Sequence, residues 1–343
     1  MKKTILTAYV ALFLSFLLPI ARLDRPAAAL AAPSSTEEAA AETPPASPSP
    51  EPEPSPESKS PEPAAVPAAQ SLRVLVDGTV TEMDMQDYLI GVVAAEMPAV
   101  FPEEALKAQA VAARSFALYC AAGHKHADAD VCTDFRDCQA WQSDEALREK
   151  WGENYPLYRD RIAAAVEATR GQYLSYEGEP VFAAFHSSSA GATEDCGQVW
   201  NPRPYLVSVP SPESAETVPN FESQLICAAL DFRDVILSAH PEADFSGPEA
   251  EWLGGIDRDE SGRVSAAVIG GVSLRGTELR SLFSLRSTAF TLRYEEGRFT
   301  FDVLGYGHGV GMSQYGASVL AGQGLDYTAI LAHYYPGTLL VAG

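Results

Sequence analysis

The chain has 343 residues and a formal net charge of −22 at pH 7, with 46 acidic and 24 basic residues. Such an acidic chain has no basic footprint to offset phosphate repulsion, so nucleic acid is excluded as a partner. Five cysteines are too few for a disulfide scaffold. No haem, iron–sulfur or dinucleotide motif is present, so we expect no organic cofactor.

The N-terminus predicts export. Lys2 and Lys3 precede an apolar run, Ile5–Ala21, that is followed by Arg22. At about 1.5 Å per residue a helix of this length falls just short of the usual hydrocarbon thickness. Residues 1–32 are therefore either a membrane anchor or a cleaved signal peptide. We favour a single N-terminal span in the cell membrane, with Lys2 and Lys3 cytoplasmic and the rest extracytoplasmic. Cleavage would instead give a secreted protein.

Residues 33–70 predict a disordered linker. They consist almost entirely of Pro, Glu, Ser and Ala, and the first 70 residues contain no glycine. This composition cannot bury apolar area, and proline favours extended polyproline II. At about 3.1 Å per residue the segment could reach on the order of 100 Å, as a tether or as an inert spacer.

Residues 71–343 predict one α+β domain in which helices are mixed with antiparallel strands. We expect helices over 85–96, with Asp84 as N-cap, and over 103–122, 157–169 and a last segment between Asp326 and Pro336. We expect strands over 72–76, 79–83, 172–176, 181–185, 264–269, 288–294 and 298–303. Residues 123–145 read as a polar loop, and 210–260 are too poorly periodic for a detailed prediction.

Glu96 is the sharpest chemical signal in the pattern. Leu89, Val93 and Glu96 follow i, i+4, i+7 spacing, which puts the carboxylate on the apolar stripe of the first helix. It also falls in the last turn, where the helix dipole disfavours an anion. Both effects raise the pKa of Glu96, as a general acid near neutral pH requires. The alternative is an exposed glutamate at a helix end.

Lys107, Val111 and Arg114 share one face of the second helix by the same spacing. If the two helices pack as an antiparallel or angled pair, Arg114 could reach Glu96, orient it, or bind a substrate carboxylate. The alternative is a solvated charged face.

Several motifs, read together, resemble the stage II sporulation protein D family (SpoIID/LytB). They are Tyr88–Pro98 (YLIGVVAAEMP), Phe101–Ser115 (FPEEALKAQAVAARS), Phe185–Thr193 (FHSSSAGAT), Val199–Tyr205 (VWNPRPY), Asp259–Val264 (DESGRV), Gly305–Ala317 (GYGHGVGMSQYGA) and His333–Gly337 (HYYPG). The resemblance covers essentially residues 72–341 in order.

The resemblance implies a grooved domain that acts as a lytic transglycosylase on peptidoglycan glycan strands, preferring strands that a partner amidase has stripped of stem peptides. It also implies a membrane-anchored protein of endospore formers, used in septal wall remodelling and engulfment. Glu96 falls where the family's catalytic acid falls, and Arg114 matches a functionally required arginine. The rival function is a non-catalytic amidase enhancer, a glycan-binding module of the same family; a structural septal protein is a second rival.

A lone carboxylate suits this reaction. An ordinary glycosidase needs two carboxylates. In a lytic transglycosylase Glu96 would protonate the leaving oxygen of the MurNAc–GlcNAc bond, and the 6-hydroxyl of the same MurNAc would close on C1 to leave a 1,6-anhydro end.

The loop 124–138 resembles a structural zinc site, since Cys thiolates and imidazoles are the usual zinc ligands. Some members of the family carry zinc here through two Cys and two His. His126, Cys132 and Cys138 match that spacing, whereas Asp137 stands where a histidine is expected. The fourth ligand is Asp137 or His124, or is missing. The alternative is a Cys132–Cys138 disulfide, which export permits.

The glycine-rich segment 305–316 lacks the Lys-Ser/Thr of a phosphate loop and the spacing of a nucleophile elbow. We expect its glycines to admit a sugar chain, with Gln314 and Tyr315 binding substrate. Tyr205, His308 and Lys107 complete the predicted substrate-binding set. Ser187–Ser189 beside His186 hint at a serine hydrolase, but the sequence indicates no partner acid.

Overall fold

The computed structural model describes residues 71–343, which lie within one compact unit. The predicted anchor over 1–32 and the linker over 33–70 lie outside these residues. Within 71–343, no helix combines the length and the apolar character that crossing a membrane requires.

The described chain opens with the predicted hairpin. Strand β1 (Ser71–Val76) pairs antiparallel with β2 (Thr79–Asp84) across Asp77-Gly78, both of which have positive φ. This is the backbone that a tight two-residue turn requires, and it explains the Asp-Gly sequence. The short strand β3 (Val131–Cys132) adds to the other edge of β1 in parallel, so the sheet order is β2-β1-β3.

The two helices that carry the main motifs form as predicted. Helix α1 (Met85–Glu96) begins after Asp84, whose carboxylate accepts hydrogen bonds from the backbone N–H groups of Gln86 and Asp87. Helix α2 (Glu103–Ala122) begins after Pro102 and carries Glu103 and Glu104 in its first turn, where the helix dipole favours acidic side chains.

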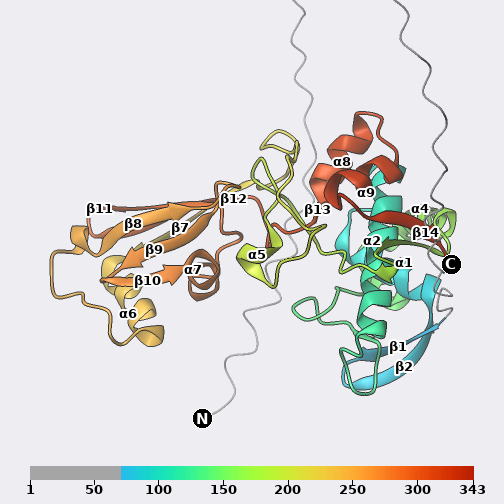
Figure 1. Ribbon diagram of the computed structural model, residues 1–343, viewed down its shortest axis with the longest axis horizontal. Helices are drawn as coiled ribbons and strands as arrows, with labels where there is room; N and C mark the ends of the chain where they lie inside the picture. The colour runs from blue at the N-terminus through green and yellow to red at the C-terminus, as the bar shows by residue number, and fades with distance from the viewer. Residues whose placement is uncertain (1–70) are drawn as a thin grey trace, which may run out of the picture. The chain divides into compact units, whose positions relative to one another are not determined.

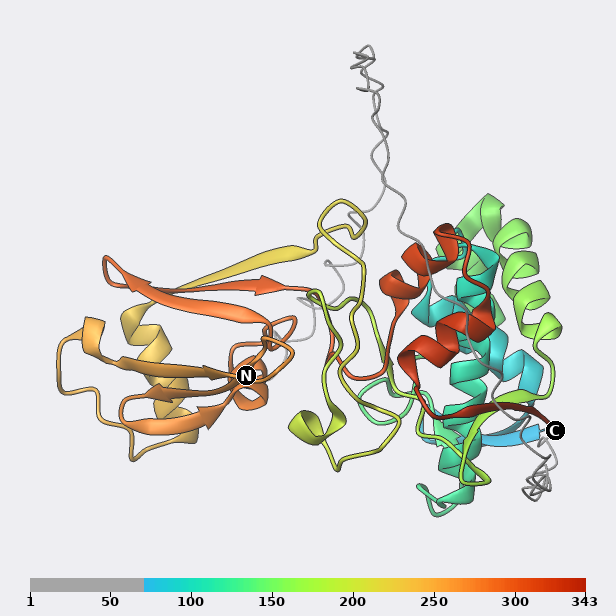
Figure 2. The same ribbon diagram turned by 45° about the horizontal axis from the view of Figure 1, so that its top comes forward.

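These helices form the centre of the larger hydrophobic cluster. Helix α2 contacts α1, α4, α8 and α9, and all five lie together in both views (Figures 1 and 2). The cluster draws buried side chains from residues 72–206 and again from 310–335. Its other helices and strands are α3 (Asp144–Trp151), the 3-10 turn η1 (Gly152–Asn154), α4 (Tyr155–Ala168), β4 (Gln172–Tyr176), β5 (Glu179–Pro180), β6 (Phe185–His186), α5 (Cys196–Val199), β13 (Met312–Ser313), α8 (Gln314–Gly322), α9 (Tyr327–Tyr334) and β14 (Leu339–Ala342).

A second hydrophobic cluster is inserted in the chain between the two halves of the first. It takes its buried side chains from residues 229–303, including the stacked rings of Phe232 and Phe299. Its two antiparallel sheets have the strand orders β11-β12-β7 and β10-β9-β8. The elements are β7 (Glu222–Ala228), α6 (Ala229–Ala239), η2 (Glu249–Glu251), β8 (Leu253–Arg258), β9 (Val264–Ile269), β10 (Val272–Arg275), α7 (Gly276–Leu282), β11 (Phe290–Glu295) and β12 (Arg298–Leu304).

The α+β class is confirmed, with several small sheets in place of one large one. Two details were wrong. The predicted strand over 181–185 does not form. The hairpin partner of β4 is the shorter strand β5, which ends at Pro180. The strands are also not all antiparallel, since β13 pairs in parallel with β6, as β3 does with β1. A groove in the domain stays a prediction.

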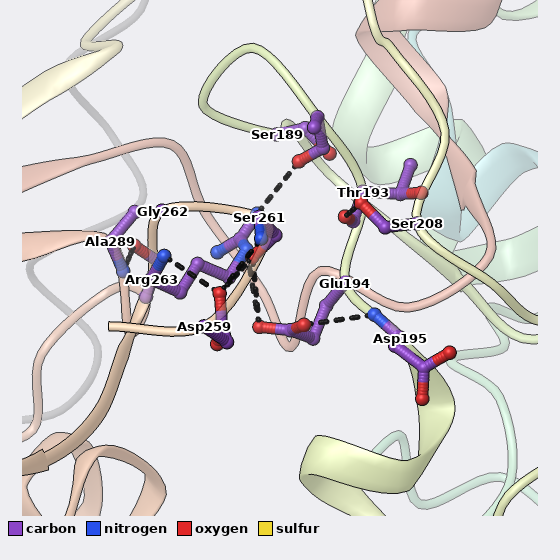
Figure 3. A network of polar contacts seen from close by, with 12 residues as sticks. Ser189, Thr193, Glu194, Asp195, Ser208, Asp259, Ser261, Gly262, Arg263 and Ala289 are labelled. Carbon is purple, nitrogen blue, oxygen red and sulfur yellow. Dashed lines mark hydrogen bonds and ion pairs between the residues drawn. The ribbon is translucent and has the colours of Figure 1, made fainter. Parts of the chain in front are cut away.

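A buried polar network joins the segment after β6 to the β8–β9 turn (Figure 3). Glu194 accepts hydrogen bonds from the backbone N–H of Asp195 (2.8 Å) and from Ser261 Oγ (3.2 Å), and it lies 3.8 Å from Arg263 Nε. Asp259 accepts from Ser261 Oγ at 2.7 Å. Burial, reinforced by the charge of Asp259, raises the pKa of Glu194 to about 7.

This network predicts a pH-dependent stability difference between the natural protein and a Glu194→Gln variant. The folded carboxyl group keeps its proton up to about pH 7, whereas the unfolded chain releases it near 4.5. The natural protein should therefore lose stability relative to the variant as pH rises through that window, by on the order of 3 kcal/mol at most. Urea unfolding at several pH values measures the difference. Glu216→Gln, at an exposed position, is the control, and a Glu194→Gln difference independent of pH would contradict the expectation.

Candidate functional site

Glu96 lies half-buried at the C-terminal end of α1 and is held by two donors from distant parts of the chain. Its Oε1 accepts a hydrogen bond from the backbone N–H of Ala140 at 3.0 Å. Its Oε2 accepts one from Gln314 Nε2 at 3.2 Å. The sequence prediction of a shielded carboxylate, as opposed to a freely exposed one, is confirmed.

Burial raises the pKa of Glu96, and it does so against two opposing hydrogen bonds. The Ala140 N–H and the Gln314 amide both favour the charged carboxylate, but desolvation is the larger effect. No Lys, Arg or His lies within ion-pair distance of Glu96 in the described part of the chain. The group is therefore suited to carry and release a proton.

The segment that supplies the Ala140 donor is seated directly on α1. The Gln142 N–H donates to the carbonyl of Gly91 at 3.2 Å, and Gln139 Nε2 donates to Tyr88 Oη at 3.1 Å. A Cβ at position 91 would lie 2.2 Å from Trp141 Nε1. Glycine at that position lets the segment lie close enough for Ala140 to reach Glu96.

The second donor comes from the start of α8. Gln314 is its first residue, and the N–H of Tyr315 donates to the carbonyl of Ser187 at 3.0 Å. The ring of Tyr315 meets that of Phe101 edge-on, with centroids 5.0 Å apart. The structure thus brings together two of the predicted residues, Glu96 and Gln314, and places Tyr315 next to the second.

Arg114 does not contact Glu96, so that part of the prediction is wrong. Its guanidinium is buried and donates to the carbonyls of Thr169 (2.8 Å) and Gln172 (2.9 Å) and to Gln86 Oε1 (3.1 Å). Burial, with a smaller effect from Arg170, lowers the pKa of Arg114 to about 10. The solvated-face alternative is also wrong. Arg114 ties α2 to the end of α4 and to β4, and a role in catalysis stays a prediction.

Two further predicted binding residues, Lys107 and Tyr205, are engaged elsewhere. Lys107 is paired within α2, with Glu103 at 2.7 Å and Glu104 at 2.9 Å. Tyr205 is buried, and its hydroxyl accepts from the N–H of Phe182 at 3.1 Å. The structure shows no hydrogen bond from either residue to Glu96.

His308 packs between two aromatic side chains, with its ring tilted against both. Its ring centroid lies 4.8 Å from that of Trp200 and 5.7 Å from that of His186. Burial, with the charges of Arg280 and Arg263, lowers the pKa of His308 to about 3, so the ring is neutral at ordinary pH. Substrate binding by Lys107, Tyr205 and His308 stays a prediction.

The predicted metal loop brings four candidate ligands together. One ligand atom from each of His126, Cys132, Asp137 and Cys138 falls within 4.8 Å of every other. His126 Nε2 lies 3.2 Å from Cys138 Sγ and 3.5 Å from Asp137 Oδ2, which in turn lies 3.5 Å from Cys132 Sγ. The group could hold a metal ion, and among the described residues His124 is not part of it.

The donor set and its spacing fit a tetrahedral site. Zinc binds Cys, His and carboxylate ligands at about 2.0–2.3 Å, which separates neighbouring ligand atoms by about 3–4 Å. Cys132 and Cys138 are both free thiols, so the structure does not form the alternative disulfide. Burial raises the pKa of Cys132 to about 12, and a bound cation would supply the charge needed to ionise it.

The Ala140 donor is a contribution that sequence reasoning missed. A backbone N–H has no side-chain signature, and the residue lies in a segment without regular secondary structure. The pairing of Gln314 with Glu96 was also not predicted, although both residues were singled out.

Comparison with known proteins identifies the family. The profile described as stage II sporulation protein matches residues 77–176. Stage II sporulation protein D of Bacillus amyloliquefaciens is 36% identical over 264 residues, covering 76% of this chain and 74% of that protein. Its Bacillus subtilis (strain 168) counterpart is 35% identical over 265 residues, covering 76% and 75%.

A third relative is named an amidase enhancer. This Bacillus subtilis (strain 168) protein is 29% identical over 302 residues, which covers 74% of this chain and 40% of the relative.

The fold and site therefore define an α+β protein with a shielded, helix-borne carboxylate and a loop able to hold a metal. The chain belongs to the stage II sporulation protein D family of sporulation proteins, as the resemblance predicted.

Proposed function

We propose that this protein is an exported peptidoglycan lytic transglycosylase, with Glu96 as its catalytic acid and base. The observation that carries the proposal is the Glu96 carboxyl group at the site of the family motif, desolvated and, within residues 71–343, without a cationic partner. Family membership supports a role in sporulation. Within sporulation we propose septal wall remodelling and engulfment, as the resemblance of the motifs implies.

Each oxygen of the Glu96 carboxyl group has its own donor and, in this proposal, its own role. Oε1 accepts from the backbone of Ala140 and fixes the orientation of the carboxyl plane. Oε2 accepts from the Gln314 amide, and in this proposal it is the oxygen that carries the proton in the acid form. When that proton moves to the leaving GlcNAc oxygen and the C1–O bond breaks, both donors stabilise the carboxylate that remains.

The second half of the reaction returns the proton. The 6-hydroxyl of the same MurNAc attacks C1, and Glu96 takes the hydroxyl proton as the 1,6-anhydro ring closes. No water is consumed, and the enzyme regains its protonated state. One carboxyl group thus suffices for both steps.

The test is mass spectrometry of stem-peptide-free glycan strands incubated with the full chain. We expect fragments with 1,6-anhydro-MurNAc ends. Ordinary reducing ends would mean hydrolysis, with a base not yet identified. Binding without cleavage would favour the second candidate, an amidase enhancer that stimulates a partner amidase, which the similarity to the protein of that name supports. Both candidates act at the cell wall, tethered to the membrane through the N-terminus.

We propose further that the loop binds a structural zinc ion through His126, Cys132, Asp137 and Cys138. Purified protein should contain close to one zinc per chain by elemental mass spectrometry. Cys138→Ser should lose most of it, because zinc prefers thiolate to hydroxyl. Cys227→Ser, at a thiol outside the group, is the control. Metal-free protein with an intact loop would contradict the proposal.

A further inference from the structure

A further buried carboxylate, Glu213, contacts the start of α8. Only 4% of the residue is exposed. It accepts hydrogen bonds from the Ser189 N–H and from Ser211 Oγ, each at 2.5 Å, and from Ser313 Oγ. Within residues 71–343 it takes part in no salt bridge.

A buried carboxylate is costly unless its oxygens are satisfied, and removing its partners costs more still. Two of the three donors come from other segments, Ser189 from the one after β6 and Ser313 from the end of β13, whereas Ser211 lies two residues before Glu213. Glu213 is the acceptor that joins these two segments to its own, the one before β7.

The contact with Ser313 leads directly to the Glu96 site. Ser313 is the N-cap of α8, and its Oγ accepts from the Gly316 N–H at 3.1 Å while donating its proton to Glu213. Both hydrogen-bonding functions of this hydroxyl are thus used to fix the first turn of the helix. Gln314, the next residue, donates to Glu96 Oε2 at 3.2 Å.

Glycine at position 316 lets the helix pack closely against this cluster. A Cβ there would lie 2.7 Å from Glu213 Oε2, 2.5 Å from Ser211 Oγ and 2.1 Å from Tyr334 Oη. Ser211 Oγ and Tyr334 Oη are themselves 2.8 Å apart. The first turn of α8 is therefore held by hydrogen bonds at Ser313 and by close packing one turn later.

We propose that Glu213 is a positioning residue of the Glu96 site, which acts through Ser313 to hold the Gln314 amide against the Glu96 carboxylate. The proposal rests on the proposed function of Glu96. Glu213 itself touches no reacting atom. It fixes the N-terminus of α8, and this in turn fixes the position of the Gln314 amide.

Losing this support has a defined electrostatic consequence. The Gln314 amide favours the ionised form of Glu96. If the amide drifts away, the pKa of Glu96 should rise by up to about one unit, the worth of one lost hydrogen bond to a carboxylate. If Glu213 only stabilised the fold, its replacement would leave the pKa of Glu96 unchanged in protein that remains folded.

The experiment is carbon-13 NMR titration of the full chain labelled at glutamate carboxyl carbons, with the Glu96 signal assigned from Glu96→Gln. Glu213→Ala and Ser313→Ala should both raise the pKa of Glu96. Glu213→Gln should stay close to the natural protein, because its amide oxygen can still accept from Ser189 and Ser313. Ser281→Ala, at an exposed position on α7, is the matched control, since it removes a serine hydroxyl that takes no part in the Glu213 cluster.

A Gln314→Met background tests whether Ser313 acts on Glu96 through the Gln314 amide. Once the amide is gone, Ser313→Ala should shift the Glu96 titration no further. An unchanged pKa of Glu96 in folded Ser313→Ala protein would overturn the proposal. So would a rise in the pKa of Glu96 that Ser313→Ala still causes in full when Gln314 is already methionine. Ser313→Ala supplies the answer if Glu213→Ala does not fold. The titration needs no substrate, so its failure is separate from a failure of Glu96→Gln to abolish cutting.

Discussion

Replacing Glu96 with glutamine is expected to lower the cutting of glycan strands by at least 10²–10⁴-fold, the range that a positioned acid–base group contributes. The amide has the shape of the carboxyl group, and its oxygen can still accept from the Ala140 N–H, so the fold should be kept. It cannot donate a proton to the leaving oxygen or take one from the 6-hydroxyl. Counting 1,6-anhydro ends by mass spectrometry measures the loss.

The pH profile of the natural protein checks the same assignment. Because burial raises the pKa of Glu96, the acid form persists to higher pH than in a free glutamate. The rate should fall as pH rises through that pKa. Glu145→Gln, at an exposed position on α3, should leave the activity and its pH profile unchanged. Undiminished cutting by Glu96→Gln protein would move the catalytic role to another residue.

Gly311→Ala is expected to destabilise the fold by about 2–5 kcal/mol. Gly311 has φ +73°, a backbone conformation that costs a residue with a Cβ about 1–2 kcal/mol. The added Cβ would also lie 2.0 Å from the carbonyl oxygen of Ala184, and relieving such a clash costs about 1–3 kcal/mol more. That carbonyl accepts from the Met312 N–H at 3.1 Å, so the residues leading into Gln314 would move as well.

The control separates the clash from the backbone strain. Gly178 has φ +90° in the turn between β4 and β5, and a Cβ there meets no atom within 4 Å. Gly178→Ala should therefore cost about 1–2 kcal/mol. Urea unfolding followed by circular dichroism gives both values. Equal losses in the two variants would show that the close approach to Ala184 is not the cause.

The sequence predicted well wherever local signals determine the structure. The Asp77-Gly78 hairpin, the Asp84 cap of α1 and the Asp326 cap of α9 all form, because each depends on a side chain and the few residues beside it. Prediction failed where structure depends on distant partners. Strand β7, in the segment left without a detailed prediction, owes its place to pairing with β12, whose partner residues lie 70 to 82 positions further on.

The same distinction applies to the candidate site. The helical spacing placed Glu96 on the apolar face correctly, since that is a property of α1 itself. The spacing could not show where Arg114 points, because its partners Thr169 and Gln172 come from another helix and a strand. Glu213 was missed altogether, because two of its three donors, Ser189 and Ser313, reach it only in the folded chain.

The pairing of Glu96 with Gln314 also sets an order of events during synthesis. The two residues are 218 positions apart, and the whole second hydrophobic cluster is made between them. A chain that is synthesised from its N-terminus therefore contains Glu96 long before Gln314, whose amide holds the Glu96 carboxylate, has been added. The nascent chain stays without a complete site until Gln314 has been made, and any product cut short before α8 remains so.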